Sequence, residues 1–147
     1  MLWFYLIVLM HHIIYLSQAK TNLSPTELVV MLLQARDNNM RQNVTGALIY
    51  GRGKFMQLLE GEEQVVRAIY RKIVADARNY EVFKLADKAI THRSFEEWSM
   101  AFAEITPRQF DHLVGYIPPA EFEQQASTGR FLDDLLLEQM KELVRPI

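Results

Sequence analysis

Residues 44–61 read VTGALIYGRGKFMQLLEG, and this stretch decides the fold. Residues 44–50 and 54–60 are two short runs of β-branched, aromatic and other apolar side chains, which is typical of strands. Gly51-Arg52-Gly53 between them is a short glycine-bearing connection of the kind that closes a β-hairpin. It also resembles half of a phosphate loop, but the third glycine and the following helix of that motif are missing. A hairpin is the better interpretation.

Before the hairpin, residues 11–17 (HHIIYLS) form an apolar, β-branched run that predicts a strand. A helix is then predicted to begin at Ser24, because a serine cap is followed by Pro25 in the first helical position and by Glu27 three residues after the cap. Apolar residues recur along it at helical spacing, and it is expected to end around residues 37–39.

After the hairpin, Val65, Ile69 and Ile73 mark an amphipathic helix over residues 62–77. Residues 82–90 and 98–103 are then predicted as strands four and five. The order βαββαββ indicates an α+β fold with a ferredoxin-like sheet, in which both helices cover one face. The first and third strands are central neighbours in that topology.

Side chains alternate between the two faces along a strand, so residue parity predicts which of them meet. Tyr15 shares one face of the first strand with Ile13 and Ser17, and Gln57 shares one face of the third strand with Phe55 and Leu59. Tyr15 and Gln57 are therefore expected side by side. By the same parity argument, Trp98, Met100 and Phe102 are expected to share one face of the fifth strand.

The opposite face of the sheet is also apolar, with Ile14 and Leu16 on one strand and Met56 and Leu58 on the other. It cannot be left in water, and the C-terminal region supplies a cover. Thr106-Pro107 is expected to open a short helix that Pro118-Pro119 breaks. A final helix is predicted from an apolar stripe of Phe131, Leu135, Leu136, Met140 and Leu143.

The overall composition restricts the function. With 147 residues, half of them hydrophobic, the chain is expected to enclose one core. A net charge of −2 favours neither nucleic acid nor an anionic membrane. There is no cysteine, which excludes thiol chemistry and fits a reducing, cytoplasmic setting. Residues 1–10 are apolar but too short to span a bilayer, and they are interpreted as an extension of the first strand or as residues upstream of a start at Met10.

Several motifs occur in order: residues 36–39 (RDNN), the hairpin of residues 44–61, residues 76–78 (DAR) and residues 98–100 (WSM). In this order and at these separations they strongly resemble the BLUF family of blue-light sensors, from about Met10 to Glu104. The resemblance implies a stand-alone photoreceptor rather than an enzyme. It also implies FAD bound between the two helices, a flavin domain over residues 10–104 and a C-terminal extension over residues 105–147.

The resemblance also assigns the site. Tyr15 matches the photoactive tyrosine, Gln57 the switching glutamine, and Trp98 and Met100 the residues that relay the signal. The residues implied to hold the flavin are Asn38, Asn39, Phe55, Gln57, Lys72, Ile73, Asp76 and Arg78. Two positions depart from the family: Lys72 stands where many relatives have arginine, and Asn79 where many have histidine. These departures affect the phosphate and ribose contacts rather than the ring site.

The chemistry of the side chains agrees with this assignment. The pyrimidine edge of a flavin mixes carbonyl acceptors with an N–H donor, and an amide offers both functions without charge. An unpaired Gln57 amide in an apolar strand costs about 1–3 kcal/mol, so a dedicated partner is expected, and Tyr15 is well placed. Without the resemblance, Tyr15 would be a core tyrosine, Gln57 an edge-facing polar residue, and the four histidines core or solvated residues.

The implied mechanism is light-driven transfer of an electron and a proton from Tyr15, followed by rearrangement of the Gln57 amide. The signal would pass to a separate partner protein or through self-association, and a homo-oligomer is expected. Two alternatives use the same fold: an acylphosphatase-like enzyme, and an interaction module that has lost the flavin. Both would be colourless, and only the first would hydrolyse acyl phosphates.

Overall fold

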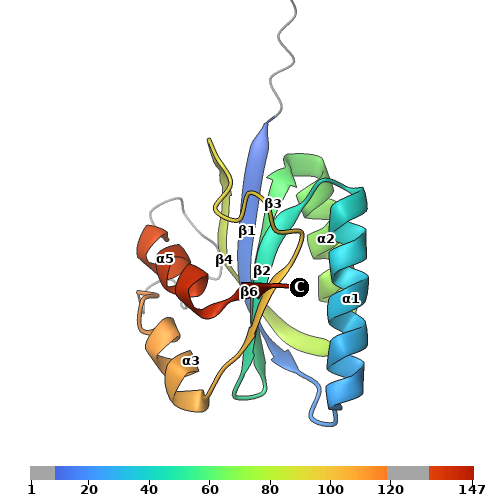
Figure 1. Cartoon of the computed structure of the whole chain (residues 1–147), viewed down its shortest axis with the longest axis vertical. Coiled ribbons are helices and arrows are strands. Elements are labelled where there is room, and N and C mark those ends of the chain that lie inside the picture. The colour runs from blue at the N-terminus through green and yellow to red at the C-terminus, as the bar shows by residue number, and fades with distance from the viewer. Residues whose placement is uncertain (1–8, 119–132) are drawn as a thin grey trace, which may run out of the picture.

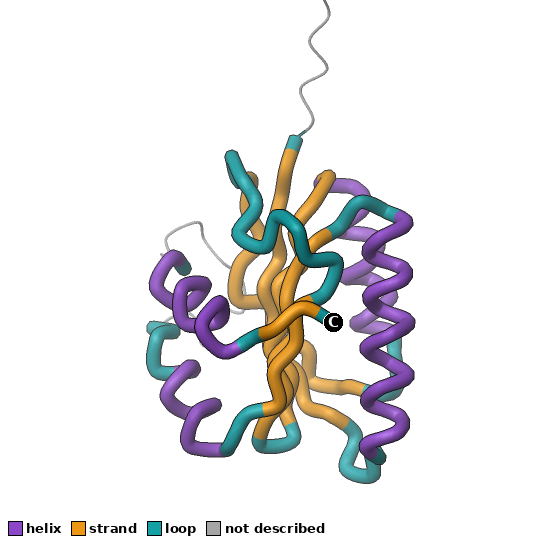
Figure 2. The backbone as a smooth tube through the Cα atoms, viewed as in Figure 1, coloured by secondary structure: helices purple, strands orange, loops and turns teal. Residues whose placement is uncertain are grey.

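A computed structural model describes residues 9–118 and 133–147. One six-stranded sheet runs through the centre, and helices cover both of its faces (Figures 1 and 2). The strands are β1 (Met10–Ala19), β2 (Thr45–Gly51), β3 (Lys54–Glu62), β4 (Asn79–Ala89), β5 (Ala101–Glu104) and β6 (Arg145–Pro146). The helices are α1 (Pro25–Arg41), α2 (Glu63–Ala75), α3 (Pro107–Val114) and α5 (Asp134–Leu143).

The strand order is β4-β1-β3-β2-β5-β6, and its first four strands have the ferredoxin-like order that the sequence predicts. β1 and β3 are antiparallel neighbours, and Tyr15 lies directly opposite Gln57. The predicted pairing is therefore confirmed. β5 extends the sheet parallel to β2, and the short strand β6, which was not predicted, closes the edge beside β5.

The local signals for the first helix and the hairpin are confirmed. The Ser24 hydroxyl accepts a hydrogen bond from the Glu27 N–H at 3.1 Å, which caps α1. Arg52 and Gly53 both adopt positive φ angles, 54° and 69°, as a tight hairpin turn requires. The helix bounds were less accurate: α1 continues to Arg41, beyond the predicted end, and α2 ends at Ala75.

The prediction for the fifth strand was wrong in one respect. β5 begins at Ala101, so Trp98 and Met100 precede it and strand alternation does not apply to them. Met100 is buried on the α1 side, in one cluster with Phe55. The Trp98 ring instead contacts Phe95 at a centroid distance of 5.9 Å, within the core on the other side. The two residues therefore do not share a face.

The second face of the sheet is covered as expected. Helices α3 and α5 lie on that face (Figure 1). Ile14, Met56 and Leu58 are fully buried there, in one core cluster with residues of these helices. α3 begins at the predicted position, where Thr106 and Gln109 form a reciprocal capping box. The apolar stripe of α5 was only partly predicted, because Leu135 is 61% exposed and the buried residues are Leu136, Leu137 and Met140. Phe131 lies outside the described residues.

None of the helices described in residues 9–118 and 133–147 has the length and apolar content needed to cross a membrane. Residues 1–8, which the sequence left as an extension of β1 or an upstream segment, lie outside the described residues.

Candidate functional site

A cavity of about 330 Å³ lies between α1, α2 and the face of the sheet that these helices cover. All eight residues that were expected to hold a cofactor line it, together with Tyr15. Six further lining residues were not assigned from the sequence: Met31, Gln34, Ala35, Leu48, Ile69 and Asn79. The three on α1 precede Asn38 by a spacing of three, four and seven residues, so helical periodicity could have found them.

The floor of the cavity carries a tyrosine and a glutamine on neighbouring strands. The Tyr15 hydroxyl donates a hydrogen bond to Gln57 Oε1, and both side chains are buried. Burial raises the pKa of the Tyr15 phenol well above its usual range, and the nearby Tyr70 and Asp76 add to this effect. Tyr15 is therefore a neutral donor at physiological pH. Because Tyr15 engages the Gln57 oxygen, the Gln57 NH₂ group is left for a partner in the cavity.

Two asparagines line the α1 side. Asn39 is 2% exposed, and its Nδ2 donates to the Ser99 carbonyl at 2.9 Å. That bond leaves Asn39 Oδ1 to accept a hydrogen bond from a ligand N–H. Asn38 Oδ1 accepts from Gln42 Nε2 at 2.9 Å, so its own NH₂ group is the end left for a ligand. Together with Gln57, these amides provide both donors and acceptors around the cavity.

Charged side chains lie where α2 leads into β4. Arg78 donates to the Asp76 carboxylate through Nε and Nη2, the latter at 2.6 Å. These hydrogen bonds lower the pKa of Asp76, although partial burial opposes the shift. Lys72 lines the same region from the last turn of α2 and is exposed. Lys72 and Arg78 together with Asp76 carry a net charge of +1, which favours binding of an anionic group at the mouth of the cavity.

The hydrogen bonds of Asn79 indicate which kind of ligand the cavity can bind. Its Nδ2 donates to the carbonyls of Ile73 and Asp76 at 3.0 and 2.9 Å, which fixes the side chain. Its Oδ1 is buried and accepts no hydrogen bond from the described residues. An unsatisfied buried acceptor costs about 1–3 kcal/mol. A ligand with hydroxyl donors would remove that cost, and the ribityl chain of a flavin carries such hydroxyls, so the residues present fit a flavin.

The two predicted relay residues do not line the cavity. Met100 lies behind it, in one buried cluster with Leu48 and Phe55, which do line it. Trp98 lies on the other side of the sheet, and its backbone carbonyl accepts from the Gly46 N–H at 3.1 Å. The structure therefore brings nine of the predicted residues together around the cavity, places Met100 directly behind them and places Trp98 on the other side of the sheet.

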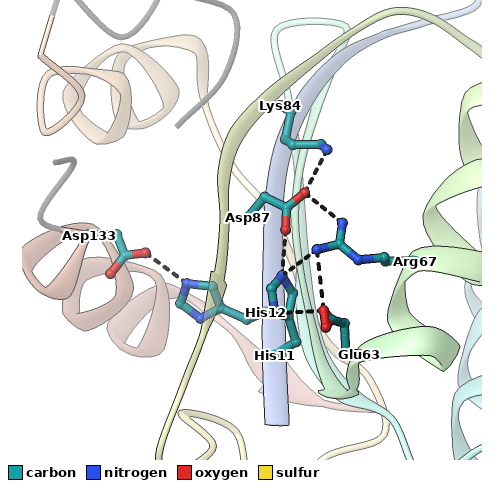
Figure 3. Close-up of polar contacts among 7 residues, drawn as sticks. All are labelled: His11, His12, Glu63, Arg67, Lys84, Asp87 and Asp133. Atoms are coloured by element: carbon teal, nitrogen blue, oxygen red, sulfur yellow. Dashed lines mark hydrogen bonds and ion pairs between the residues drawn. The ribbon is translucent and has the colours of Figure 1, made fainter. Parts of the chain in front are cut away.

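A polar cluster fixes α2 against β1 and β4 (Figure 3). Asp87 accepts hydrogen bonds from Lys84 at 2.7 Å, from Arg67 at 3.0 Å and from His11. Burial opposes ionisation of Asp87, but these bonds outweigh it and hold its pKa far below the ordinary value. Glu63 also lies within 3.5 Å of Arg67. This cluster positions the helix that carries Ile69, Lys72 and Ile73.

The next histidine points to the other face of the sheet (Figure 3). His12 Nε2 lies 2.8 Å from Asp133 Oδ2, and Lys88 Nζ lies 2.8 Å from Asp133 Oδ1. His12 and Asp133 are both almost fully buried. Burial opposes ionisation of Asp133, but the hydrogen bonds from His12 and Lys88 outweigh it and lower its pKa. Asp133 directly precedes α5, so this contact fastens the C-terminal helix to β1 and β4.

These features define a ferredoxin-like domain with an amide-lined cavity between two helices and a hydrogen-bonded tyrosine and glutamine at its floor. The family model for BLUF, described as sensors of blue-light using FAD, matches residues 10–101. The chain belongs to the BLUF family, as its motifs indicated.

Similar proteins include single-domain and larger ones. The blue light- and temperature-regulated antirepressor BluF of Escherichia coli K12 is 30% identical over 102 residues, which are 69% of this chain and 25% of that protein. The photoactivated adenylate cyclase subunit beta of Euglena longa is 32% identical over 108 residues, 73% of this chain and 12% of that protein. The chain thus spans a quarter or less of these two curated relatives.

Among solved structures, BlsA in its ground state superposes with a TM-score of 0.71 at 25% identity, covering 89% of this chain and 87% of BlsA. The dark-state structure of the BLUF protein BlrB gives a TM-score of 0.65 at 25% identity, covering 92% of this chain and 98% of BlrB.

Proposed function

We propose that this chain is a blue-light photoreceptor that binds FAD in the cavity between α1 and α2 and signals through the Tyr15–Gln57 hydrogen bond. The observation that carries the proposal is the placement of these two side chains: they lie opposite each other on β1 and β3, are joined by a hydrogen bond, and both line the cavity. Asn39 and Gln57 would hold the ring. Lys72 and Arg78, which also line the cavity, would contact the phosphates.

When bound, the flavin supplies absorption of blue light and an excited state that accepts an electron. Tyr15 would be the electron donor. Its raised pKa keeps the phenol protonated beforehand, and its proton would follow the electron to the flavin. Removal of that proton takes away the donor that holds Gln57 Oε1, so the Gln57 amide can rearrange. Exchange of one or two hydrogen bonds changes the free energy by about 1–3 kcal/mol, which suits a switch between two states.

Output is proposed to pass to a separate protein or through self-association in a homo-oligomer, and the chain itself is proposed to carry no catalytic activity. The names of the relatives describe an antirepressor and subunits of adenylate cyclases, so sensors of this family act on different outputs. We also propose residues 10–104 as the flavin-binding part and residues 105–147 as the extension. The absence of cysteine supports a cytoplasmic setting.

The test is an absorption spectrum of the purified protein in the dark and after blue light. We expect a yellow protein whose flavin bands shift slightly to the red and return in the dark. Chromatography of the chromophore released by heat would distinguish FAD from FMN and riboflavin. A colourless protein that also takes up no added FAD would refute the proposal.

A further inference from the structure

Glu60 is a buried carboxylate outside the cavity. It lies on β3 three residues after Gln57 and is 0% exposed. A charge at such a position is costly unless it is fully hydrogen-bonded. Three donors converge on it: the Thr45 hydroxyl at 2.8 Å, and the backbone N–H groups of Ser94 and Phe95, both at 2.7 Å. Its partners are thus neutral donors, and two of them belong to a loop.

Residues 93–100 form most of the loop that connects β4 to β5, and they return to the cavity. The first part of this segment is fixed to β3 by Glu60. Its last part is fixed elsewhere, because the Trp98 carbonyl accepts from Gly46 N–H on β2 and the Ser99 carbonyl accepts from Asn39 Nδ2 on α1. The Trp98 N–H also donates to the Phe95 carbonyl at 3.1 Å, which joins the two parts. Glu60 and a cavity-lining amide thus hold opposite ends of one short segment.

Arg93 strengthens the first attachment without neutralising the carboxylate directly. Its guanidinium donates to the Thr45 hydroxyl at 3.0 Å, to the Glu60 backbone carbonyl at 3.2 Å and to the Asn43 carbonyl at 2.8 Å. The Thr45 hydroxyl therefore accepts a hydrogen bond from Arg93 and donates one to Glu60. Only a group that accepts at both oxygens can satisfy all three donors, and glutamine would present an NH₂ group to one of them.

We infer that Glu60 is a positioning residue: it sets the place of residues 93–100, and so the Ser99 carbonyl that orients Asn39, and it links this segment to the strand that carries Gln57. The inference rests on the proposed function only where light is concerned. Glu60 touches no part of the cavity and acts through the segment. Without the carboxylate, the backbone N–H groups of Ser94 and Phe95 lose their attachment to β3, where the Arg93 bond to the Glu60 backbone carbonyl remains, while the Tyr15–Gln57 pair stays intact.

The experiment compares flavin-loaded wild type with Glu60→Gln and a matched control, Glu62→Gln. Glu62 is on the same strand, is exposed, and makes no side-chain cap to α2. Hydrogen exchange at Ser94 and Phe95 is measured in the dark and under blue light, together with the absorption spectrum and the side-chain amide resonance of Asn39. The amide resonance reports a change that a loss of stability alone would not produce.

We expect Glu60→Gln to bind flavin and keep the red shift. A glutamine oxygen can still accept from Thr45 and Phe95, so the NH₂ group faces Ser94, whose N–H should exchange about tenfold faster in the dark because it loses a hydrogen bond to a charged acceptor. The Asn39 resonance should move, and the light-dependent change in exchange over residues 93–104 should disappear. Glu62→Gln should match wild type. Should Glu60→Gln fail to fold, Thr45→Val removes one donor and should produce a smaller acceleration, about threefold.

The inference is overturned if exchange at Ser94 and Phe95 in Glu60→Gln or Thr45→Val equals that of the control. It is also overturned if Asn39 does not respond, or if the red shift is lost while exchange is unchanged. A wild type with no red shift would refute the proposed photochemistry instead. The role of Glu60 would then be read from dark exchange and the Asn39 resonance alone.

Discussion

Asp133 gives the sharpest test of how the C-terminal helix is held on the sheet. Its carboxylate lies 2.8 Å from His12 on β1 (Figure 3) and 2.8 Å from Lys88 on β4. Asp133→Asn keeps the shape of the side chain but removes the charge. Breaking a buried ion pair by removing one partner costs about 3–5 kcal/mol. Since the Lys88 side chain is 30% exposed and water takes over part of its solvation, we expect a loss of about 2–3 kcal/mol in the free energy of unfolding.

The loss should depend on pH in a definite direction. The folded-state pKa of Asp133 is lowered, so its contribution is fully present above the ordinary pKa of about 3.9 and disappears as the pH falls through the lowered value. Urea unfolding of wild type and Asp133→Asn over a pH series measures the difference between them. Asp87, whose pKa is also lowered, contributes equally to the pH dependence of both proteins, so its contribution cancels when the two curves are subtracted. The difference should be largest at neutral pH and vanish in acid.

Asp134→Asn is the matched control, because Asp134 is the next residue, is exposed, and lies in the first turn of α5. Its charge interacts with the helix N-terminus, which is worth at most about 1 kcal/mol. A loss in Asp133→Asn no larger than that of the control, or a loss that stays constant down to acid pH, would refute the reasoning.

The remaining predictions concern the switch and its output. Tyr15→Phe and Gln57→Leu should bind flavin but lose the red-shifted state, because neither can exchange the hydrogen bond; a normal photocycle in either would contradict the mechanism. Met100→Ala should lower the free energy of unfolding by about 2–4 kcal/mol and keep the red shift, while proteolysis of the C-terminal region no longer differs between dark and light. Truncation after Glu104 should keep the photocycle and cause self-association on gel filtration through the uncovered face around Ile14; a monomer would contradict this.

Much of the fold and of the cavity could be predicted because the deciding signals are local or periodic. Strand alternation placed Tyr15 and Gln57 on one face, and the capping serine and the glycine turn marked the ends of elements. The amides were found through the order of the motifs. Each of these signals lies within a single strand, helix or turn, and the family resemblance fixed how they combine.

The features that escaped prediction depend on distant contacts or on irregular backbone. Trp98 and Met100 face opposite sides because they precede β5, where alternation has not begun. The partner of His12, Asp133, lies 121 residues away, and the partners of Glu60 include two backbone groups of an irregular loop. Any residue except proline supplies a backbone N–H, so the sequence of that loop does not predict hydrogen bonds to a buried carboxylate. On α5, Leu137 is buried in place of the predicted Leu135, because the apolar residues of this ten-residue helix are compatible with more than one buried face.

The sheet separates the cavity from α3 and α5, and two routes connect these sides. The direct route passes through β3, where Gln57 faces the cavity and Met56 and Leu58 face the C-terminal helices. β3 is paired on both edges and buried on both faces, so moving it disrupts close-packed contacts on every side.

The other route goes around the edge of the sheet. Residues 93–100 lead from Glu60 to Met100, whose carbonyl accepts from the N–H of Ile147 at the C-terminus. β5 pairs with β2 over four residues and with β6 over two, so far fewer contacts resist a shift at this edge. The free energy of exchanging a few hydrogen bonds is enough to displace the β5–β6 edge of the sheet but not the central strand β3. The attachment of residues 93–95 to Glu60 lies at the start of this softer route, and under the proposed mechanism it would decide whether a change at Gln57 and Asn39 reaches the C-terminus.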